Sequence, residues 1–313
     1  MSVIATTRRA PLSPRWRVQL AAVPLATRLH WVLRVSVAGE FIGHGLVGTS
    51  RPAAWLPYFH LFGFNNHFAR TTMPIIGSWD ITIGVLVLFL PLRWMLLWTS
   101  VWGLFTALLR PAAGQGWWEF VERGGNYGPP FALLLLTGVD ANWRSPRYLL
   151  QRVSSRPLLT PKKARQLQWI LRVSVALLLI GHGGIGVFNH PGWASYFRLF
   201  GVDRAAVQAH SLIAIVGWGE IALGFAVLIR PFPALLLFVL GWKVFSELLR
   251  PIAGEHVGQF IERFGDYCAP IALILVLRYL KRTPVVAELA QSASCGAPAV
   301  PSSFERSDVG AAP

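Results

Sequence analysis

The sequence predicts an all-α integral membrane protein with eight transmembrane helices, arranged as two parallel tandem four-helix bundles. Three observations predict this fold class. Of the 313 residues, 54% are hydrophobic and only 14% are charged, whereas soluble domains carry about a quarter charged residues. Apolar stretches recur at lengths close to the roughly 20 residues that a helix needs to cross a bilayer. The chain also contains one long stretch twice.

The repeated stretch runs from Leu33 to Gly48 and returns from Leu171 to Gly186, an offset of 138. When residues 29–63 are compared with 167–201 at that offset, 19 of 35 positions are identical. Internal repeats indicate a fold built from copies of one unit. Because four spans per unit bring both copies into the membrane in the same direction, we expect the copies to be related by rotation about the membrane normal.

Polar and apolar segments divide the chain into five parts. We call the two membrane units the first half and the second half. The expected parts are a basic cytoplasmic tail at 1–28, the first half at 29–140, a basic cytoplasmic linker at 141–166, the second half at 167–281, and a disordered cytoplasmic tail at 282–313.

Each half contains four apolar spans. They are expected at 29–48, 73–90, 94–109 and 126–139, and again at 167–187, 211–229, 233–249 and 266–280. The fourth span is too short to cross a bilayer alone. Either its helix extends back through polar residues, or 110–127 and 250–267 fold back as re-entrant segments, which require surrounding protein or water. The sequence leaves both alternatives open.

The basic residues predict the orientation. With the N-terminus inside, inner segments hold 18 Lys and Arg and outer segments hold 8. The positive-inside rule then places both termini in the cytoplasm. The formal net charge of +15 therefore reflects orientation, and no groove-reading module indicates nucleic-acid binding. The two cysteines, Cys268 and Cys295, show no metal-ligand spacing and indicate no disulfide framework.

Ionisable residues inside apolar spans are costly and raise a functional hypothesis. His44 and His182 lie in the repeated sequence Gly-His-Gly-x-x-Gly. Each histidine is either a proton relay or ligand for a bound head group, or a packed side chain hydrogen-bonded across helices. Asp80 and Glu220, in the second span of each half, are expected at a similar depth. Because a buried acid shifts its pKa or finds a cation, the histidine is its expected partner.

A longer polar constellation follows the third span of each half. Two readings are open: an ion pair between Arg110 and Glu122 that fastens the loop, or an outer pocket in which arginine binds an anion or carbonyl beneath Tyr127. We expect one polar cluster in the outer half of each unit. The cluster residues are His44, Asp80, Arg110, Glu122 and Tyr127 in the first half, and His182, Glu220, Arg250, Glu262 and Tyr267 in the second.

The halves also differ at a few charged positions. Glu40 occurs only in the first half, four residues before His44 on the same helical face. Lys243 and Glu247 occur only in the second half and share the spacing of an intrahelical ion pair. These differences indicate that the halves are not functionally equivalent.

The four-span unit resembles the DoxX-like family of small four-helix membrane proteins. The resemblance rests on Leu-Arg-Val at 33–35 and 171–173, and on an acidic residue followed by glycine at 80–84 and 220–224, with Leu-x-x-Pro after it. Where that family continues toward a lysine in its first span, this chain has Gly-His-Gly-x-x-Gly. The resemblance implies a bacterial inner-membrane protein that serves a quinone or a redox complex, as one family member does in a thiosulfate:quinone oxidoreductase.

Three functions remain as hypotheses. In a quinone-linked subunit, a histidine would hydrogen-bond the quinone carbonyl, a carboxylate would relay protons, and a soluble or membrane-bound redox partner would carry the redox centre. A transporter would use the outer arginines as a site for a small anionic or polar solute. A structural or assembly protein would have no small-molecule site.

Overall fold

The computed structural model describes residues 24–138, 144–188, 193–202 and 211–295. The regular structure of these residues is helical, apart from one isolated β-bridge between Leu92 and Arg152. The helices of the first half are α2 (Leu25–Thr49), α3 (Leu56–His60), α4 (Asn66–Phe89), α5 (Arg93–Ala112), α6 (Trp117–Glu122) and α7 (Gly124–Thr137), with a 3-10 turn, η1 (Ala53–Trp55). After α8 (Pro146–Leu149) in the linker, the second half contains α9 (Pro161–Phe188), α10 (Ala194–Arg198), α12 (Ser211–Ile229), α13 (Pro233–Ile252), α14 (Val257–Glu262) and α15 (Phe264–Cys295).

The prediction of an all-helical fold is confirmed for the described residues, because each apolar span coincides with a helix except at its ends. Among the described residues, three helical segments are long and apolar enough to cross a membrane: α4, α9 and residues 212–229 of α12. α7 is short, and α13 contains Lys243 and Glu247. Of the tails predicted at 1–28 and 282–313, residues 1–23 and 296–313 lie outside the described residues. The described parts differ from the prediction, because α2 already begins at Leu25 and α15 continues as helix to Cys295. Residues 285–293 of this extension contain alanine, glutamate, leucine and glutamine, which favour helix.

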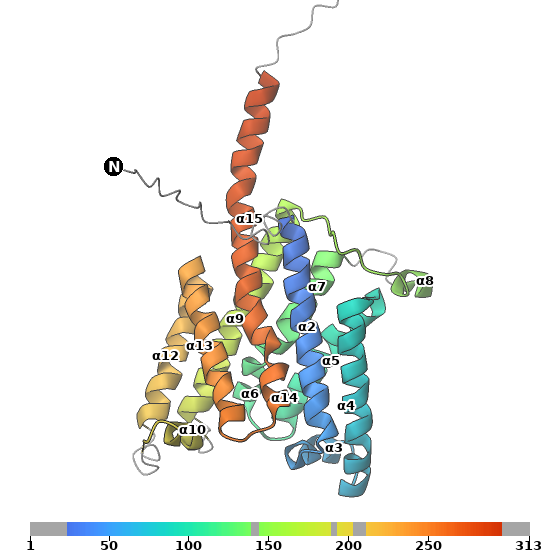
Figure 1. Ribbon diagram of the computed structural model, residues 1–313, viewed down its shortest axis with the longest axis vertical. Coiled ribbons are helices and arrows are strands. Elements are labelled where there is room, and N and C mark those ends of the chain that lie inside the picture. Colours follow the sequence, from blue (N-terminus) through green and yellow to red (C-terminus); the bar gives the residue numbers. More distant parts are fainter. Residues whose placement is uncertain (1–23, 139–143, 189–192, 203–210, 296–313) are drawn as a thin grey trace, which may run out of the picture.

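The helices form one bundle with a central and two outer groups (Figure 1). α2, α7, α9 and α15 pack against one another in the centre. α4 and α5 lie on one side of this group, and α12 and α13 lie on the other. The shared core contains leucine and valine side chains from both halves, among them Leu33, Val37, Leu171, Val175 and Leu273.

The two halves are interlocked through their short helices. α6 of the first half packs on α9 of the second, and α14 of the second half packs on α2 of the first. Glycine permits these contacts. A Cβ atom on Gly43 would lie 2.0 Å from the backbone nitrogen of Glu262, and one on Gly181 would lie 2.0 Å from that of Glu122. The first glycine of each Gly-His-Gly-x-x-Gly therefore admits the other half's short helix.

The last segment of each half is a broken helix. Arg123 separates α6 from α7, and Arg263 separates α14 from α15. Residues 110–127 are thus neither a continuous helix nor an irregular re-entrant loop. They contain the end of α5, a turn in which Gly114 and Gly116 have positive φ, and the short helix α6. The same order of elements occurs at residues 250–267.

Helices α4 and α12 expose apolar side chains and bury acidic ones, the reverse of the pattern in a water-soluble protein. Their large apolar side chains are exposed, for example Ile75 at 66% and Ile215 at 65%. Their carboxylates, by contrast, face the bundle interior, where Asp80 is 0% and Glu220 1% exposed. Burial of the acids and exposure of the apolar groups is the pattern expected where the surrounding solvent is lipid.

Candidate functional site

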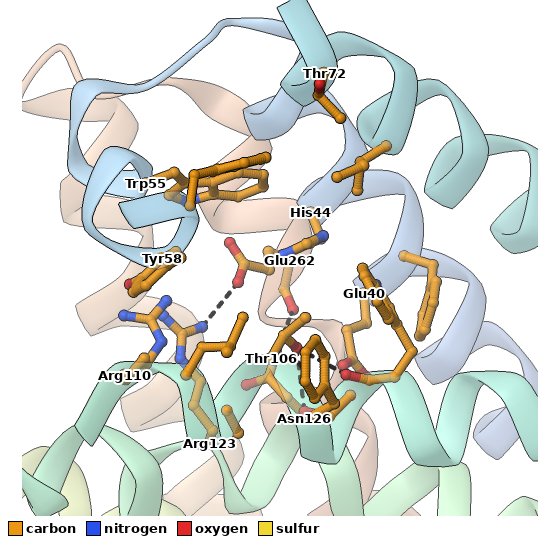
Figure 2. Close-up of a pocket in the computed structure, with 18 of the residues that line it drawn as sticks. Glu40, His44, Trp55, Tyr58, Thr72, Thr106, Arg110, Arg123, Asn126 and Glu262 are labelled. Carbon is orange, nitrogen blue, oxygen red and sulfur yellow. Dashed lines mark hydrogen bonds and ion pairs between the residues drawn. The ribbon is translucent and has the colours of Figure 1, made fainter. Parts of the chain in front are cut away.

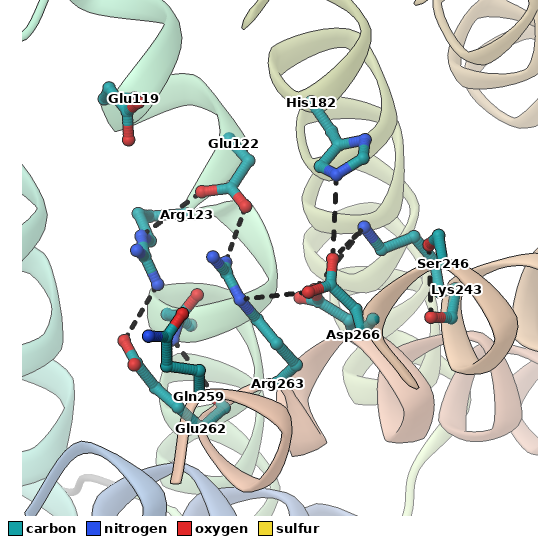
Figure 3. A network of polar contacts seen from close by, with 12 residues as sticks. Glu119, Glu122, Arg123, His182, Lys243, Ser246, Gln259, Glu262, Arg263 and Asp266 are labelled. Carbon is teal, nitrogen blue, oxygen red and sulfur yellow. Dashed lines mark hydrogen bonds and ion pairs between the residues drawn. The ribbon is translucent and has the colours of Figure 1, made fainter. Parts of the chain in front are cut away.

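Two arginines and two glutamates form a buried ion cluster between the halves (Figure 3). Arg123 Nη1 lies 2.8 Å from Glu262 Oε1, and Arg263 Nη1 lies 2.5 Å from Glu122 Oε1. Arg123 Nε also lies 3.2 Å from Glu122 Oε2. Because each arginine stands at a helix break and bonds the glutamate of the other half, the cluster fixes both breaks and joins the halves.

Each repeated histidine bonds the carboxylate that the sequence indicated. His44 Nδ1 lies 2.8 Å from Asp80 Oδ2, and His182 Nδ1 lies 2.5 Å from Glu220 Oε2. A tryptophan ring stacks on each histidine, Trp55 on His44 and Trp193 on His182, with ring centroids 4.7 Å and 4.4 Å apart. The bond at Nδ1 leaves Nε2 of His44 as the ring nitrogen available to a ligand.

The ion pair between Arg110 and Glu122, one of the two open readings, does not form in the described structure. Arg110 Nη1 instead lies 3.2 Å from Glu119 Oε2, one helical turn earlier on α6. In the second half, Arg250 Nε lies 2.6 Å from Glu247 Oε2 and does not pair with Glu262. The physical reason is the exchange of short helices, which carries Glu122 away from Arg110 and Glu262 away from Arg250. The polar cluster is therefore shared between the halves, and it is not duplicated within each.

The two tyrosines of the predicted cluster pack beside the short helices. Tyr127 stacks on Phe120 with ring centroids 5.4 Å apart, and Tyr267 donates a hydrogen bond of 3.1 Å to the carbonyl oxygen of Phe260. Neither tyrosine closes over an arginine. Tyr196, on the short helix α10, instead bonds Glu255 beside Arg250. Burial, together with that carboxylate, raises the pKa of Tyr196 above its usual range.

The first half encloses a cavity of about 330 Å³ with aromatic walls and a charged end (Figure 2). This volume lies at the lower end of the range for small-molecule sites. α2, α3, α4 and α5 supply its walls, and the helix break at Arg123 and α14 complete it. Its aromatic lining consists of Phe41, Trp55, Tyr58, Phe59, Phe62, Phe64, Phe68, Trp102 and Phe105, and its charged or histidine lining of Glu40, His44, Arg110, Arg123 and Glu262.

The corresponding region of the second half is largely filled. Its cavity measures about 140 Å³. Lys243 and Glu247 occupy the positions that match Gly103 and Ala107, which line the larger cavity of the first half. Lys243 Nζ lies 2.7 Å from Glu247 Oε1, as the sequence indicated for an intrahelical pair, and 3.9 Å from Asp266 Oδ2. The charged residues that distinguish the halves therefore decide which half has the larger cavity.

A third cavity, of about 320 Å³, lies between the halves. It shares Trp55, Tyr58 and Arg110 with the first-half cavity, and Trp193 and Tyr196 with the smaller cavity of the second half. All four arginines of the cluster region line it, and each has a carboxylate partner. The three cavities thus lie side by side, separated by tryptophan, tyrosine and arginine side chains.

Sequence reasoning missed several residues that build this site. Arg123, Arg263, Trp55 and Trp193 all line cavities, and both members of each pair stand at matched positions of the two halves. The signal was the presence of Glu-Arg and of the tryptophan in both copies. Asn126 was missed because its counterpart is Asp266, so the residue type differs between the copies.

The described residues contain no group of three or more His, Cys, Asp or Glu side chains placed to hold a metal ion. Comparison of the chain with family models, with curated proteins and with solved structures finds no match.

Proposed function

We propose that the protein is a multi-pass membrane protein of the DoxX-like type that binds a small amphipathic ligand in the cavity of its first half. The eight-span topology, with both termini in the cytoplasm of a bacterial inner membrane, is part of this proposal. Its support is the exposure of apolar side chains on α4 and α12, the burial of their carboxylates, and the distribution of basic residues in the connecting segments.

The main support for a binding function is a difference between two halves of similar sequence. The first half keeps an aromatic cavity with a charged end, whereas the second half fills the same region with a lysine–glutamate pair. A purely structural repeat has no reason to keep a cavity in only one half, because an empty cavity costs stability. The aromatic walls suit the apolar body of a ligand, and the end lined by Glu40, His44 and Arg123 suits its polar group.

The resemblance to DoxX-like proteins offers a quinone as one such ligand. Nε2 of His44 could donate to or accept from a quinone oxygen, and a separate redox partner would supply the electrons. Transport is a second candidate function. It is favoured by the cavity between the halves, which adjoins the ligand cavity at Trp55, Tyr58 and Arg110 and gives a solute a second compartment.

The test uses the full-length protein purified in detergent. Native mass spectrometry identifies small molecules that co-purify, and quenching of tryptophan fluorescence measures binding of a short-chain quinone, because Trp55 and Trp102 line the cavity. Gly103→Leu fills the cavity with little backbone strain, since a Cβ there has its nearest neighbour at 3.6 Å. Gly241→Leu on α13 is the matched control, because its Cβ has no neighbour within 4 Å.

We expect Gly103→Leu to lose the co-purifying molecule, and the Gly241→Leu protein to retain it. Retention of the same molecule by both variants would place the ligand elsewhere. Absence of any bound small molecule from the native protein, together with no binding of added amphipathic probes, would contradict the binding function.

A further inference from the structure

Glu40 is the carboxylate of the first-half cavity that lacks an ion pair in the described structure. Its side chain is only 4% exposed, yet it lines the cavity, and its Oε2 atom has no hydrogen-bond partner among the described residues (Figure 2). The side chain of Asn126 is a hydrogen-bond partner of this carboxyl group, but a buried carboxylate without a cation partner is costly unless it is neutralised. The side chain of Glu40 thus lines a cavity large enough for a ligand.

The basic side chains near Glu40 bond other carboxylates. Arg123 bonds Glu262 and Glu122, and Arg110 bonds Glu119. On the same helix as Glu40, His44 bonds Asp80 of α4 through Nδ1. The acidic groups Glu262 and Asp266 of the second half also act on Glu40, and Lys243 Nζ lies 3.9 Å from Asp266 Oδ2. The site around Glu40 therefore lacks a cation of its own.

The second half supplies that missing cation from its own sequence. Lys243 stands at the position that matches Gly103, is fully buried, and places its ammonium group 2.7 Å from Glu247. In the first half, the lysine, the glutamate and Asp266 are replaced by Gly103, Ala107 and Asn126. The carboxylate comes instead from α2, where Glu40 stands at the position of Leu178.

The position that lacks a lysine side chain in the first half, Gly103, lies directly beside Glu40. A Cβ atom added to Gly103 would lie 3.7 Å from Glu40 Oε1, at ordinary contact distance. A lysine side chain at position 103 would therefore start next to Glu40 and extend through the cavity, as an alkyl chain that ends in an ammonium group.

We infer that the first-half cavity binds an organic amine, with the protonated nitrogen on Glu40 and an apolar body against the aromatic walls. Trp55, Trp102 and Phe105 are suited to this ligand because aromatic rings attract cations and pack against apolar chains. The inference names the ligand class of the site proposed above and rests on that proposed function. It distinguishes the ligand from a quinone, which carries no positive charge.

Binding of three probes with the same body tests the inference: phenylbutylamine, phenylbutanol and phenylbutyrate. Near neutral pH they present a cation, a neutral hydroxyl and an anion. We expect the amine to bind at least about tenfold more tightly than the alcohol, a difference of about one and a half kcal/mol, and the acid to bind weakest. Glu40→Gln should abolish the preference for the amine over the alcohol, because it keeps the shape of the side chain and removes its charge.

A second test needs no ligand. Gly103→Lys should create in the first half an ion pair like that of Lys243 and Glu247 in the second, with the new ammonium group bonded to Glu40. Compared with Gly103→Met, which has a similar length and no charge, the lysine variant should melt about 2–4 °C higher. In the Glu40→Gln background this advantage should disappear. Gly103→Lys should also block binding of phenylbutylamine.

The outcomes separate the inference from the proposed function. Equal affinity for the amine and the alcohol, or an amine preference that survives Glu40→Gln, would overturn the amine assignment. Melting of Gly103→Lys no higher than that of Gly103→Met would also count against it. If a quinone binds in a Gly103→Leu-sensitive manner while the amine does not, the proposed function stands and this inference fails. If no probe of any charge binds, both fail.

Discussion

Arg123 and Glu262 form an ion pair of 2.8 Å that joins residues 139 positions apart in the chain. Its counterpart, Arg263 with Glu122, crosses between the halves in the opposite direction at 2.5 Å. Glu262 therefore lies beside the Gly-His-Gly-x-x-Gly segment of the first half, and Glu122 beside that of the second half. As a consequence, the charged end of the first-half cavity includes Glu262 from the second half. The ligand site is a product of both halves.

Loss of this crossing pair should weaken the whole protein. Glu262→Ala leaves Arg123 buried with one carboxylate in place of two, so we expect thermal stability in detergent to fall by up to about 3–5 kcal/mol, the cost of breaking a buried pair. Arg123→Ala should cost a similar amount. The double variant should lose less than the sum of the two, by about 0.5–3 kcal/mol, because the residues are in contact. Strictly additive losses would contradict the pairing; Arg147→Ala, on the exposed linker, is the control.

The close approach of α14 to α2 makes a second prediction. Gly43→Ala would place a methyl group 2.0 Å from the backbone nitrogen of Glu262. Because the neighbouring atom belongs to the backbone and cannot rotate away, we expect a loss of at least about 1–3 kcal/mol, as for other overpacked cores. Gly219→Ala on α12 is the control, since its Cβ has no neighbour within 4 Å. Melting curves of the two variants in the same detergent provide the measurement, and equal stability would show that the helices do not meet at Gly43.

The sequence was sufficient for the helices and for the histidine pairs. Apolar stretches of helical length predicted each long helix, and the depth of His44 and Asp80 in successive spans predicted their contact. Both predictions depend on local pattern and on the up-and-down course of the chain. They do not require knowledge of which helix packs beside which.

The sequence was insufficient for the partners of Glu122 and Glu262. Both were assigned to arginines of their own half, because neighbours in sequence are usually neighbours in space. The exchange of α6 and α14 between the halves depends on close contacts at Gly43 and Gly181. A glycine in a sequence indicates that some backbone approaches, but it does not identify which one. A pocket at Arg110 was one of the two open readings, but the difference in cavity size between the halves was not predicted. That difference depends on the small residues Gly103 and Ala107, which carry no chemical signal of their own.

The His44–Asp80 pair should respond as a unit. His44→Ala leaves Asp80 buried and unpaired, and Asp80→Ala removes the carboxylate that orients the ring against Trp55. Each variant should lower thermal stability in detergent, and the double variant should lose less than the sum of the two. Binding provides a second readout, because His44 lines the cavity and Asp80 does not. Affinity for the co-purified ligand should therefore fall in both single variants, and affinity unchanged in both would mean that the ligand does not touch His44.

The proposed membrane topology makes the final prediction. The linker that follows α7 and the extension of α15 lie toward the same end of the bundle, the upper end in Figure 1, whereas α3 and α10 lie at the opposite end. If the bundle crosses the membrane along this axis, reporters fused at Ser154 and after Ala290 must lie on the same side, and the surplus of basic residues makes that side cytoplasmic. A cysteine introduced at Asn65, before α4, should instead be labelled from outside intact cells by an impermeant thiol reagent. Labelling is read against the native protein, whose Cys268 is buried. The topology requires Ser154 and Ala290 on one side of the membrane and Asn65 on the other. One reporter on the external side, or an Asn65→Cys variant that is labelled only after cell lysis, would therefore contradict it.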